Sequence, residues 1–313
     1  MSGMPLILDE EAVRSLLRMD ELIPAMATAL ADLSRGKVVQ PMRVMMPVEE
    51  HGGFLGLMPA YGGALGAKLV TFYPNNQGVP THHALILLFK PETGEPLVTM
   101  DGRLITEMRT AAVSAVATKL LARPEASVLA ILGSGVQARS HLEAMRLVRA
   151  FSEIRVWSPR NAGAFARQFG VHAADSAAEA VRGADVVVVA TTSQVPVLRG
   201  EWLSPGTHIN AVGAPRPTWR ELDDAILRAA RIYVESREAA TRESGDIIAA
   251  GHVAFSAGAH FCLGAPLARL HGEIALTTLL ARLPGLRLAG EPDWRGFVPL
   301  HELEHLPVAW DVG

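Results

Sequence analysis

The feature that most constrains the fold is a glycine-rich turn between an apolar run and a helical segment. In SVLAILGSGVQA, an apolar run is followed by a G-x-G-x-x-A pattern made of Gly133, Gly135 and Ala138. The first glycine permits a tight turn, the second lets the backbone approach a pyrophosphate, and the small third residue lets helix and strand pack closely. The N-terminus of the following helix offers free N–H groups to phosphates. The pattern predicts a strand, a turn and a helix that together bind a dinucleotide.

The alternation of apolar runs and helical segments continues from Ser127. Apolar runs suited to buried strands lie at 127–133, 153–158, 184–192 and 207–213, and helical patterns lie at 136–148 and 162–169. Continuous Val, Ile and Leu runs separated by helices are typical of a parallel sheet that is covered on both faces. We therefore predict an α/β fold with a Rossmann-like, doubly wound parallel sheet in a domain of residues 120–251.

The residues before this domain have a different pattern. A helical pattern covers 9–36, and a second one covers 106–126 and ends near Pro124. Apolar strands are expected at 54–61, 66–74 and 83–102, the last of them a hairpin turned by PETGEP. These elements predict a separate α+β domain of residues 1–119.

Composition limits the partners. The 313 residues carry a net charge of -3 with a pI near 6.4, so nothing favours nucleic acid or an acidic membrane surface as a partner. The single cysteine, Cys262, is compatible with a reducing compartment. The first residues lack the order of a signal peptide, and the apolar runs are too short to span a bilayer. We expect a cytoplasmic protein, and a small anionic substrate would need a local basic site.

The end of the second predicted strand bears on the choice of dinucleotide. An NAD site usually has Asp or Glu there, whereas an NADP site has small and basic residues. This chain reads RVWSPRNAG, with Ser158, Arg160 and Asn161 and no acid. The sequence favours NADP(H), with NAD(H) as the alternative if Arg160 is only a solvated loop charge.

Three basic residues of the first domain lie in apolar surroundings: Arg43, Lys68 and Arg109. A buried cation is costly unless an anion pairs with it, and arginine gives the strongest, bidentate recognition of a carboxylate. Together they predict a clamp for a substrate carboxylate. Taken singly, each is more often an ion-pair partner within the protein or a surface side chain.

At these segments the chain resembles the ornithine cyclodeaminase and mu-crystallin family of dinucleotide-dependent enzymes. The likeness covers residues 6–251 through QPMR, LGLMPAY, KLVTFY, RTAAVSAVATK, ILGSGVQA, RPTWRELDD and ESGDII. It implies a homodimer formed through the first domain, and an imino or amino acid carboxylate held by Arg43, Lys68 and Arg109. It also implies a cofactor site lined by Thr81, Arg109, Val136, Gln137, Ser158, Thr191, Val212 and Gly213.

Two departures separate this chain from the cyclodeaminase branch of the family. That branch has acidic residues where this chain has Gly56 and Pro215, and neither can serve the amine chemistry of ornithine. The pattern is closer to mu-crystallin-like ketimine reductases, which implies NADPH-dependent reduction of a pyrroline-2-carboxylate or piperideine-2-carboxylate type of ketimine. Lys68 would donate or tune the proton of the imine, or would act only on the carboxylate. Conversion of ornithine to proline and ammonia with NAD, and crystallin-like NADPH binding without turnover, are the alternatives.

The last 62 residues, 252–313, do not continue this pattern. They contain F-x-x-G-x-H-x-C-x-G, filled by Phe255, Gly258, His260, Cys262 and Gly264, which resembles the haem-ligand loop of haem-thiolate monooxygenases. Cys262 would be the iron ligand, but the opposite wall of a haem site has no counterpart in the chain, so we expect no haem. The segment also lacks the family's returning helix with its Ser and Lys, and has an atypical helix at about 266–283 instead. A natural fusion, an engineered chimera and a sequence artefact all fit this change.

Overall fold

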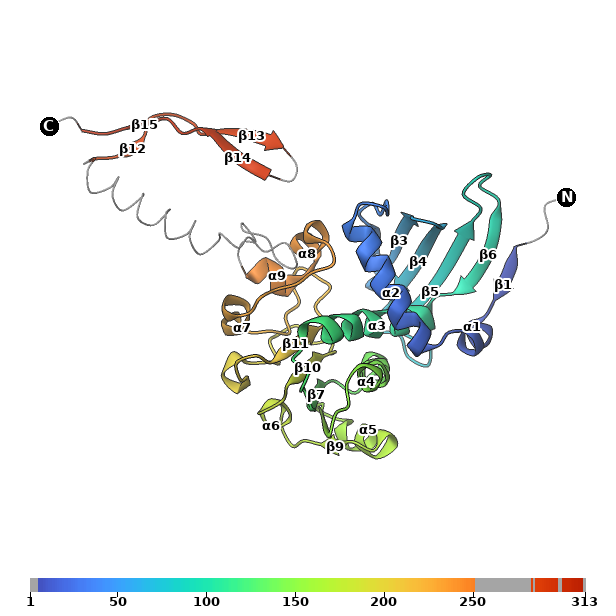
Figure 1. Cartoon of the computed structure of the whole chain (residues 1–313). Helices are drawn as coiled ribbons and strands as arrows, with labels where there is room; N and C mark the ends of the chain where they lie inside the picture. The colour runs from blue at the N-terminus through green and yellow to red at the C-terminus, as the bar shows by residue number, and fades with distance from the viewer. Residues whose placement is uncertain (1–4, 251–282, 284, 298–299, 312–313) are drawn as a thin grey trace. The chain divides into compact units, whose positions relative to one another are not determined.

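The computed structural model describes residues 5–250, 283, 285–297 and 300–311 (Figure 1). The chain divides into two compact units, Met1–His252 and Val253–Gly313. Cys262, the rest of the haem-like pattern and the helix expected at about 266–283 lie outside the described residues. The described part therefore bears on the predicted dinucleotide and substrate sites, and not on the haem pattern.

The first sheet of the larger unit has six strands. Their order is β1 (Leu6–Leu8), β6 (Pro96–Asp101), β5 (His82–Phe89), β4 (Leu65–Phe72), β3 (Gly53–Tyr61) and β2 (Val44–Val48). Neighbours pair antiparallel except β1, which runs parallel to β6. The strands expected at 54–61, 66–74 and 83–102 are confirmed, including the hairpin, where Lys90 N–H donates to the Glu95 carbonyl. Strands β1 and β2 are additional to the prediction.

The helical pattern at 9–36 forms two helices rather than one: α1 (Glu10–Leu16) and α2 (Met19–Ser34). The Asp9 carboxylate caps α1 by accepting the Ala12 N–H at 2.9 Å. The backbone then becomes extended at Leu17 and Arg18, which ends the first helix. This break turns the chain so that both helices pack against the core.

The second sheet has five parallel strands. Their order is β11 (His208–Ala211), β10 (Val186–Val189), β7 (Val128–Leu132), β8 (Glu153–Trp157) and β9 (His172–Ala173). The strand order reverses at β7, which is the first strand in the chain order of this sheet. This order is that of a doubly wound nucleotide-binding sheet, so the predicted fold class is confirmed.

Helices cover both faces of the five-stranded sheet. They are α3 (Arg103–Leu121), α4 (Val136–Val148), α5 (Ala162–Phe169), α6 (Ala177–Val181) and α7 (Asp224–Ala229). Alternate residues of β10 enter different cores: Val186 and Val188 pack with α3 and α4, while Val187 and Val189 pack with α6 and α7. The chain continues into α8 (Arg237–Glu243) and α9 (Gly245–Ala249).

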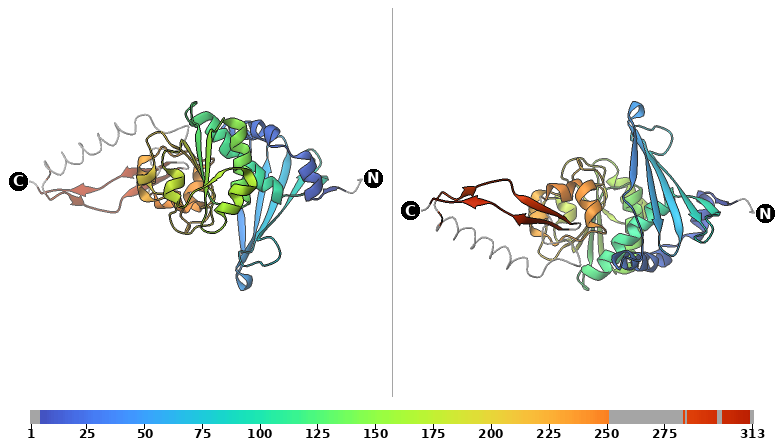
Figure 2. Two further views of the ribbon diagram at one scale, coloured as in Figure 1. Left: turned by 90° about the horizontal axis from the view of Figure 1, so that it is seen from below. Right: turned by 90° about the horizontal axis from the view of Figure 1, so that it is seen from above.

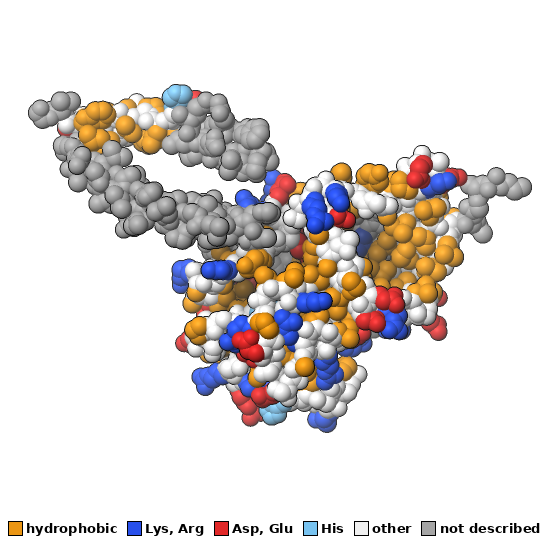
Figure 3. All heavy atoms as spheres, viewed as in Figure 1, with side chains coloured by type: hydrophobic (Ala, Val, Ile, Leu, Met, Phe, Trp, Pro, Cys, Tyr) orange, Lys and Arg blue, Asp and Glu red, His pale blue; other side chains and the backbone are white. Residues whose placement is uncertain are grey.

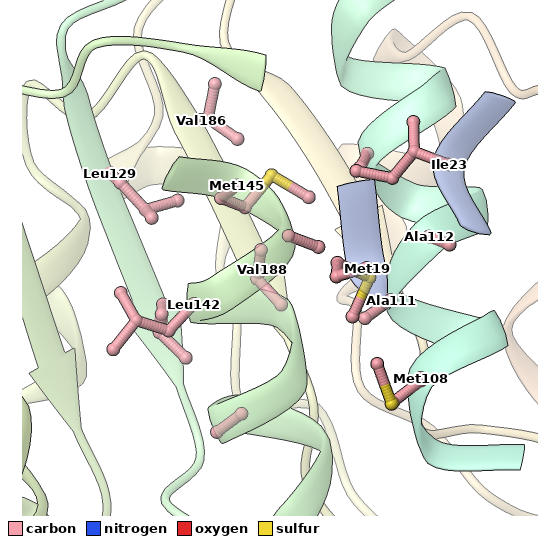
Figure 4. Close-up of a cluster of buried hydrophobic side chains, with 14 of the residues drawn as sticks. Met19, Ile23, Met108, Ala111, Ala112, Leu129, Leu142, Met145, Val186 and Val188 are labelled. Atoms are coloured by element: carbon pink, nitrogen blue, oxygen red, sulfur yellow. The ribbon is translucent and has the colours of Figure 1, made fainter. Parts of the chain in front are cut away.

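Helix α3 joins the two sheets. It lies between them with α2 in Figures 1 and 2, and Ala111, Ala112 and Ala115 are fully buried in the core that it shares with α2, α4 and β7 (Figure 4). The helix ends at Leu121, with Ala122 as its C-cap, just before Pro124 as expected. The boundary between the two domains, placed at residues 119 and 120, falls within the last turn of α3, and that division stays a prediction.

The smaller unit contributes two short antiparallel pairs: β12 (Arg287–Leu288) with β15 (Val308–Ala309), and β13 (Asp293–Phe297) with β14 (Leu300–His305). Among the described residues of the chain, none of the helices has both the length and the apolarity that a membrane crossing requires.

Candidate active site

The six-stranded sheet presents one face to α3, called here the inner face. Lys68, Val70 and Phe72 point to it from β4, and the residues paired with them on β5 are Ile86, Ala84 and His82. Helix α3 starts against this face, because the Gly102 N–H donates to the Ala84 carbonyl at 2.8 Å. Lys68 is therefore a half-buried cation on a face made mostly of apolar side chains.

The structure brings the three predicted cations together. Burial lowers the pKa of Lys68 to about 8, and the nearby positive charges of Arg109 and Arg43 add to the effect. Arg109 reaches this place from α3, and Arg43 lies directly before β2. Like charges in a half-buried site repel one another, so the cluster favours an anion between them.

The carboxylate of Glu243 already satisfies one of these cations. Arg43 Nε donates to Glu243 Oε1 at 2.7 Å, and its Nη2 contacts the other oxygen, so the pair is bidentate. Both side chains are about one-quarter exposed. Within the described residues, Lys68 and Arg109 have no carboxylate partner. The charge available to a ligand therefore lies on Lys68 and Arg109.

The two histidines of PTHHALILLF lie on opposite faces of β5, as the strand pattern predicts. His82 points to the inner face, where burial and the charge of Lys68 lower its pKa, while His83 is exposed on the other face. His82 is therefore neutral at physiological pH and lies within electrostatic reach of the cation cluster.

Gly56 lies on the inner face, on β3, the strand beside the edge strand β2. An added Cβ there would lie 2.9 Å from Val70 Cγ1 and 3.0 Å from Met45 Sδ. Side chains thus fill the space that an acidic residue would need at this position. Pro215, the other departure from the cyclodeaminase pattern, is exposed in the loop after β11.

The same loop sends Arg216 onto the inner face. Its guanidinium lies 5.1 Å from the ring centres of Phe54 and Phe72 and 5.0 Å from that of Trp219. Stacking on aromatic faces stabilises a cation without an ion pair. Arg216 therefore ties the loop after β11 to the sheet that carries Lys68.

The glycine turn has the geometry that its sequence predicts. Gly133 has φ +121°, and an added Cβ would lie 2.3 Å from the Ala190 carbonyl oxygen, so only glycine fits. Gly135 is exposed, with open space around an added Cβ. A cavity of about 270 Å³ opens beside the turn and is lined by Ser134, Gly135, Val136, Arg139, Phe165, Gln168 and Phe169.

The residues after Gly135 fit a phosphate group. Gly135 is the N-cap of α4 and gives no side-chain cap to its first turn. Val136 is about half exposed at the same end of the helix. An approaching dinucleotide would therefore meet free N–H groups in an open space.

The residues predicted to choose the dinucleotide lie beside this turn. Ser158 Oγ donates to Ser134 Oγ at 2.9 Å and accepts the Asn161 N–H at 3.2 Å. Arg160 is exposed and, among the described residues, makes no ion pair. The end of β8 thus presents hydroxyl and amide groups and one unengaged guanidinium, with no carboxylate.

The other predicted cofactor residues lie at strand ends: Thr191 after β10, Val212 and Gly213 after β11, and Thr81 directly before β5. Thr191 and Gly213 are joined by the carboxylate of Glu221, and Val212 N–H donates to the Val189 carbonyl at 2.9 Å. Thr81 is exposed, and its carbonyl accepts the Tyr73 N–H at 2.8 Å. These residues therefore come from both sheets.

Sequence reasoning missed three residues at this site: Arg216, Glu221 and Glu243. Arg216 and Glu221 belong to RPTWRELDD, and Glu243 begins ESGDII; both segments are part of the family resemblance. The signal was therefore present in the pattern. The sequence alone does not show that they are buried, because most of the partners that bury them are distant in the chain.

Comparison with known proteins places the chain. The model of the family described as "Ornithine cyclodeaminase/mu-crystallin family" matches residues 4–273. The chain belongs to this family. The resemblance predicted from the sequence is confirmed, and the family match continues past Gly251 into the segment with the haem-like pattern.

Three relatives in the ornithine cyclodeaminase/mu-crystallin family are informative. The ketimine reductase mu-crystallin of Mus musculus is 51% identical over 264 residues, covering 80% of this chain and 84% of the relative. The solved structure of Thermococcus litoralis Delta(1)-pyrroline-2-carboxylate reductase, in complex with NADH and L-proline, has a TM-score of 0.74 and 40% identity, covering 78% of this chain and 80% of that chain. An archaeal alanine dehydrogenase dimer with bound NAD has a TM-score of 0.74 and 40% identity, covering 78% of each chain.

Lys68 gives a stability prediction for this family member. The pKa of Lys68 in the folded protein lies below the unfolded value of 10.5, so the ammonium group destabilises the folded state. This destabilisation is full below about pH 8 and disappears as pH rises toward 10.5. Lys68→Met should therefore raise the free energy of unfolding at pH 7 by about 1–3 kcal/mol. Urea unfolding at pH 7 and pH 10 measures this gain, which should shrink at the higher pH.

The matched control for this variant is Lys119→Met, since Lys119 is exposed on α3. It should change the free energy of unfolding by no more than about 0.5 kcal/mol. Destabilisation by Lys68→Met at pH 7 would mean that the Lys68 ammonium is stabilised by the folded protein, contrary to this account.

Proposed function

We propose that this protein reduces a cyclic ketimine carboxylate to the cyclic amino acid with NADPH. The substrate is of the pyrroline-2-carboxylate or piperideine-2-carboxylate type. The observation that carries the proposal is the pair Lys68 and Arg109, two cations in one site with no carboxylate partner among the described residues. The relatives named ketimine reductase and pyrroline-2-carboxylate reductase support it.

The charges of the site fit the two ends of such a substrate. Arg109 gives a planar guanidinium that can bind the carboxylate through two hydrogen bonds, and Lys68 adds a point charge beside it. Arg43 can join them when Glu243 moves away. Fixing the carboxylate orients the ring, so that the C=N carbon meets the reductant in one geometry.

The glycine turn, Ser158 and Arg160 are the residues that would hold the cofactor. When bound, a reduced nicotinamide supplies the hydride that the C=N carbon accepts. The nitrogen takes a proton in the same conversion. Lys68 is the proton donor whose pKa, about 8, suits this step, because an efficient general acid has a pKa close to the working pH. Neutral His82 lies on the same face and can accept or relay a proton.

Ornithine cyclisation is the alternative within the family. It needs acidic groups for the second ammonium ion and for the amine chemistry. Gly56 has Val70 and Met45 against it, and Pro215 carries no ionisable group. The inner face thus offers cations and apolar walls, which favour a substrate with one carboxylate and no second ammonium group.

The choice of NADPH rests on the end of β8. Arg160 is exposed without an ion pair among the described residues, so its guanidinium is available for a 2′-phosphate. Ser158 donates and accepts hydrogen bonds there and brings no negative charge that would repel the phosphate. Relatives with bound NADH or NAD make NAD(H) the alternative.

The protein forms a homodimer through the outer face of the six-stranded sheet, the side opposite Lys68. Large apolar side chains are exposed along this face on five strands: Ile7, Val44, Met46, Leu57, Tyr61, Leu85 and Leu97. Figure 3 views this domain from the side on which α2 lies in front of the sheet and shows further exposed apolar side chains there. An apolar sheet face of this extent is typical of a protein interface, and the archaeal relative is a dimer.

The activity test follows NADPH absorbance with piperideine-2-carboxylate and pyrroline-2-carboxylate. We expect oxidation of NADPH by the full chain, and at least a hundredfold loss of kcat/KM in Arg109→Leu, because the carboxylate loses its bidentate partner. NADPH binding without oxidation would instead support the crystallin-like alternative. Ammonia release from ornithine with NAD would support the cyclodeaminase.

The pH profile separates the two roles of Lys68. Both roles require the ammonium form, so kcat/KM should fall as pH rises through about 8. Lys68→Arg keeps the charge and does not titrate in this range. Retained kcat without the alkaline fall would limit Lys68 to carboxylate binding, whereas collapse of kcat with little change in KM would support proton donation.

Arg160→Ala tests the choice of dinucleotide. If Arg160 binds the 2′-phosphate, the Kd for NADPH should rise about 10- to 100-fold while the Kd for NADH, which lacks this phosphate, stays within about twofold. Nicotinamide fluorescence measures both constants. Equal small effects on the two cofactors would mean that Arg160 is a solvated loop charge.

Leu85→Glu tests the dimer. Leu85 is 51% exposed in the middle of the outer face, so a buried charge there should split the dimer into protomers. Light scattering after size exclusion gives the mass. Leu120→Glu is the matched control, because Leu120 is 75% exposed at the end of α3 and should leave the mass unchanged. A Leu85→Glu protein that keeps the wild-type mass would place the interface elsewhere.

A further inference from the structure

Glu221 is a fully buried carboxylate at the ends of β10 and β11. One oxygen accepts the Thr191 N–H at 2.8 Å and also the Thr191 hydroxyl, and the other accepts the Gly213 N–H at 2.7 Å. Thr191 follows β10 and Gly213 follows β11, which are adjacent parallel strands. One side chain therefore holds two neighbouring loops together at the edge of the sheet where dinucleotides bind in folds of this class.

The hydroxyl of Thr191 is fully used in this arrangement. It donates to Glu221 and accepts the Ser193 N–H at 3.0 Å, so its direction is fixed. Gly213 approaches so closely that an added Cβ would lie 2.4 Å from Glu221 Oε1 and 2.3 Å from the Thr191 carbonyl oxygen. The spacing between the two loops is therefore set by the carboxylate and leaves no room for adjustment.

A second carboxylate, that of Asp246, binds the backbone of Glu221. Asp246, buried in α9, accepts the N–H groups of Glu221 and Leu222 at 3.2 Å and pairs with Arg220 at 3.0 Å. The backbone of Glu221 is thus fixed by the ESGDII segment. The residue is therefore hydrogen-bonded at both ends, at its backbone N–H by Asp246 and at its carboxylate by Thr191 and Gly213.

The charges around Glu221 are few. Asp246 repels it, and the guanidinium of Arg220 is engaged by Asp246 and Asp224. The Glu221 carboxylate itself has no ion pair within the described residues, and its charge rests on the donors of Thr191 and Gly213. Burial raises the pKa of Glu221 to about 7, against these hydrogen bonds.

We infer that Glu221 is a positioning residue for the cofactor: its ionised carboxylate holds Thr191 and Gly213 at the spacing that the nicotinamide end of a dinucleotide requires. The inference rests on the proposed function, since it assumes that NADPH or NADH binds along this edge. Protonation of Glu221 replaces one acceptor oxygen by a hydroxyl, which breaks the pattern of three donors on one carboxylate. Cofactor binding should therefore strengthen as pH rises through about 7.

The experiment titrates NADH, which has no 2′-phosphate to titrate, into the full chain between pH 6 and pH 9 and follows nicotinamide fluorescence. In Glu221→Gln, the amide group faces backbone N–H donors, so the Kd should rise at least tenfold at pH 8 and lose its pH dependence. The control is Glu179→Gln: Glu179 lies in α6, its carboxylate accepts the Asp175 N–H just before that helix, and the variant should bind NADH as the wild type does.

Two further measurements keep the inference testable if Glu221→Gln folds poorly. Thr191→Val removes one donor from the carboxylate and should move the midpoint of the pH dependence upward. Hydrogen exchange of the Thr191 and Gly213 amides should also be measured in the unliganded wild type at pH 8 and pH 6. Protonation of Glu221 loosens the two loops, so the rates at pH 6 should exceed those expected from the intrinsic pH dependence of exchange alone.

The outcomes are distinct. A wild type that binds neither NADH nor NADPH would overturn the proposed function, and this inference with it. A wild type that binds NADH, with Glu221→Gln equal to it in Kd and pH profile, would overturn the positioning role alone. A wild-type Kd that is flat between pH 6 and pH 9, with no midpoint to shift in Thr191→Val, would do the same.

Discussion

The close packing of α3 against α4 is the contact on which the rest of the larger unit depends. Three alanines of α3, Ala111, Ala112 and Ala115, are fully buried, and Ala138 and Ala144 of α4 are equally buried in the same core. Small side chains let the two helix axes approach, and any larger residue would force them apart. Because α3 also begins on the inner face of the other sheet, this contact fixes Arg109 relative to the glycine turn.

The candidate site contains two partly or fully buried ionisable side chains, Lys68 and Glu221, whose charged forms lower the stability of the folded protein. Lys68 is held half-buried with its pKa lowered to about 8, and Glu221 is held fully buried with its pKa raised to about 7. Both shifts mean that the folded protein disfavours the ionised side chain, which a sequence selected only for stability would replace by an apolar residue. Groups perturbed in opposite senses, here Lys68 on β4 and Glu221 beside the ends of β10 and β11, are typical of functional sites.

The sequence predicted well what depends on local pattern. The glycine turn, the alternation of buried strands with helices and the PETGEP hairpin each involve residues close in the chain, and each is present. The helical pattern at 9–36 is also present, but its division into two helices at Leu17 and Arg18 reflects packing that periodicity does not encode. The sequence also predicted that three cations in apolar surroundings form one cluster, because a buried charge without a partner is costly and is therefore rare outside binding sites.

Contacts between distant residues could not be predicted in this way. Glu243 lies 200 positions after Arg43, and Glu221 lies 30 positions after Thr191. In the sequence each glutamate is one acid among 32 acidic residues, and nothing local distinguishes it from a solvated one. Only the folded chain brings these partners together: β10 lies beside β11, so that one carboxylate reaches the loops after both, and the end of α8 lies beside the residue before β2.

The bidentate pair between Arg43 and Glu243 changes how ligand affinity at this site is counted. A carboxylate that takes Arg43 must release Glu243, so the number of ion pairs on Arg43 is the same before and after binding. Ligand binding at that arginine is an exchange between two anions. Glu243 on α8 therefore competes with any carboxylate ligand for Arg43, and an anion that cannot also engage Lys68 and Arg109 has little advantage over it.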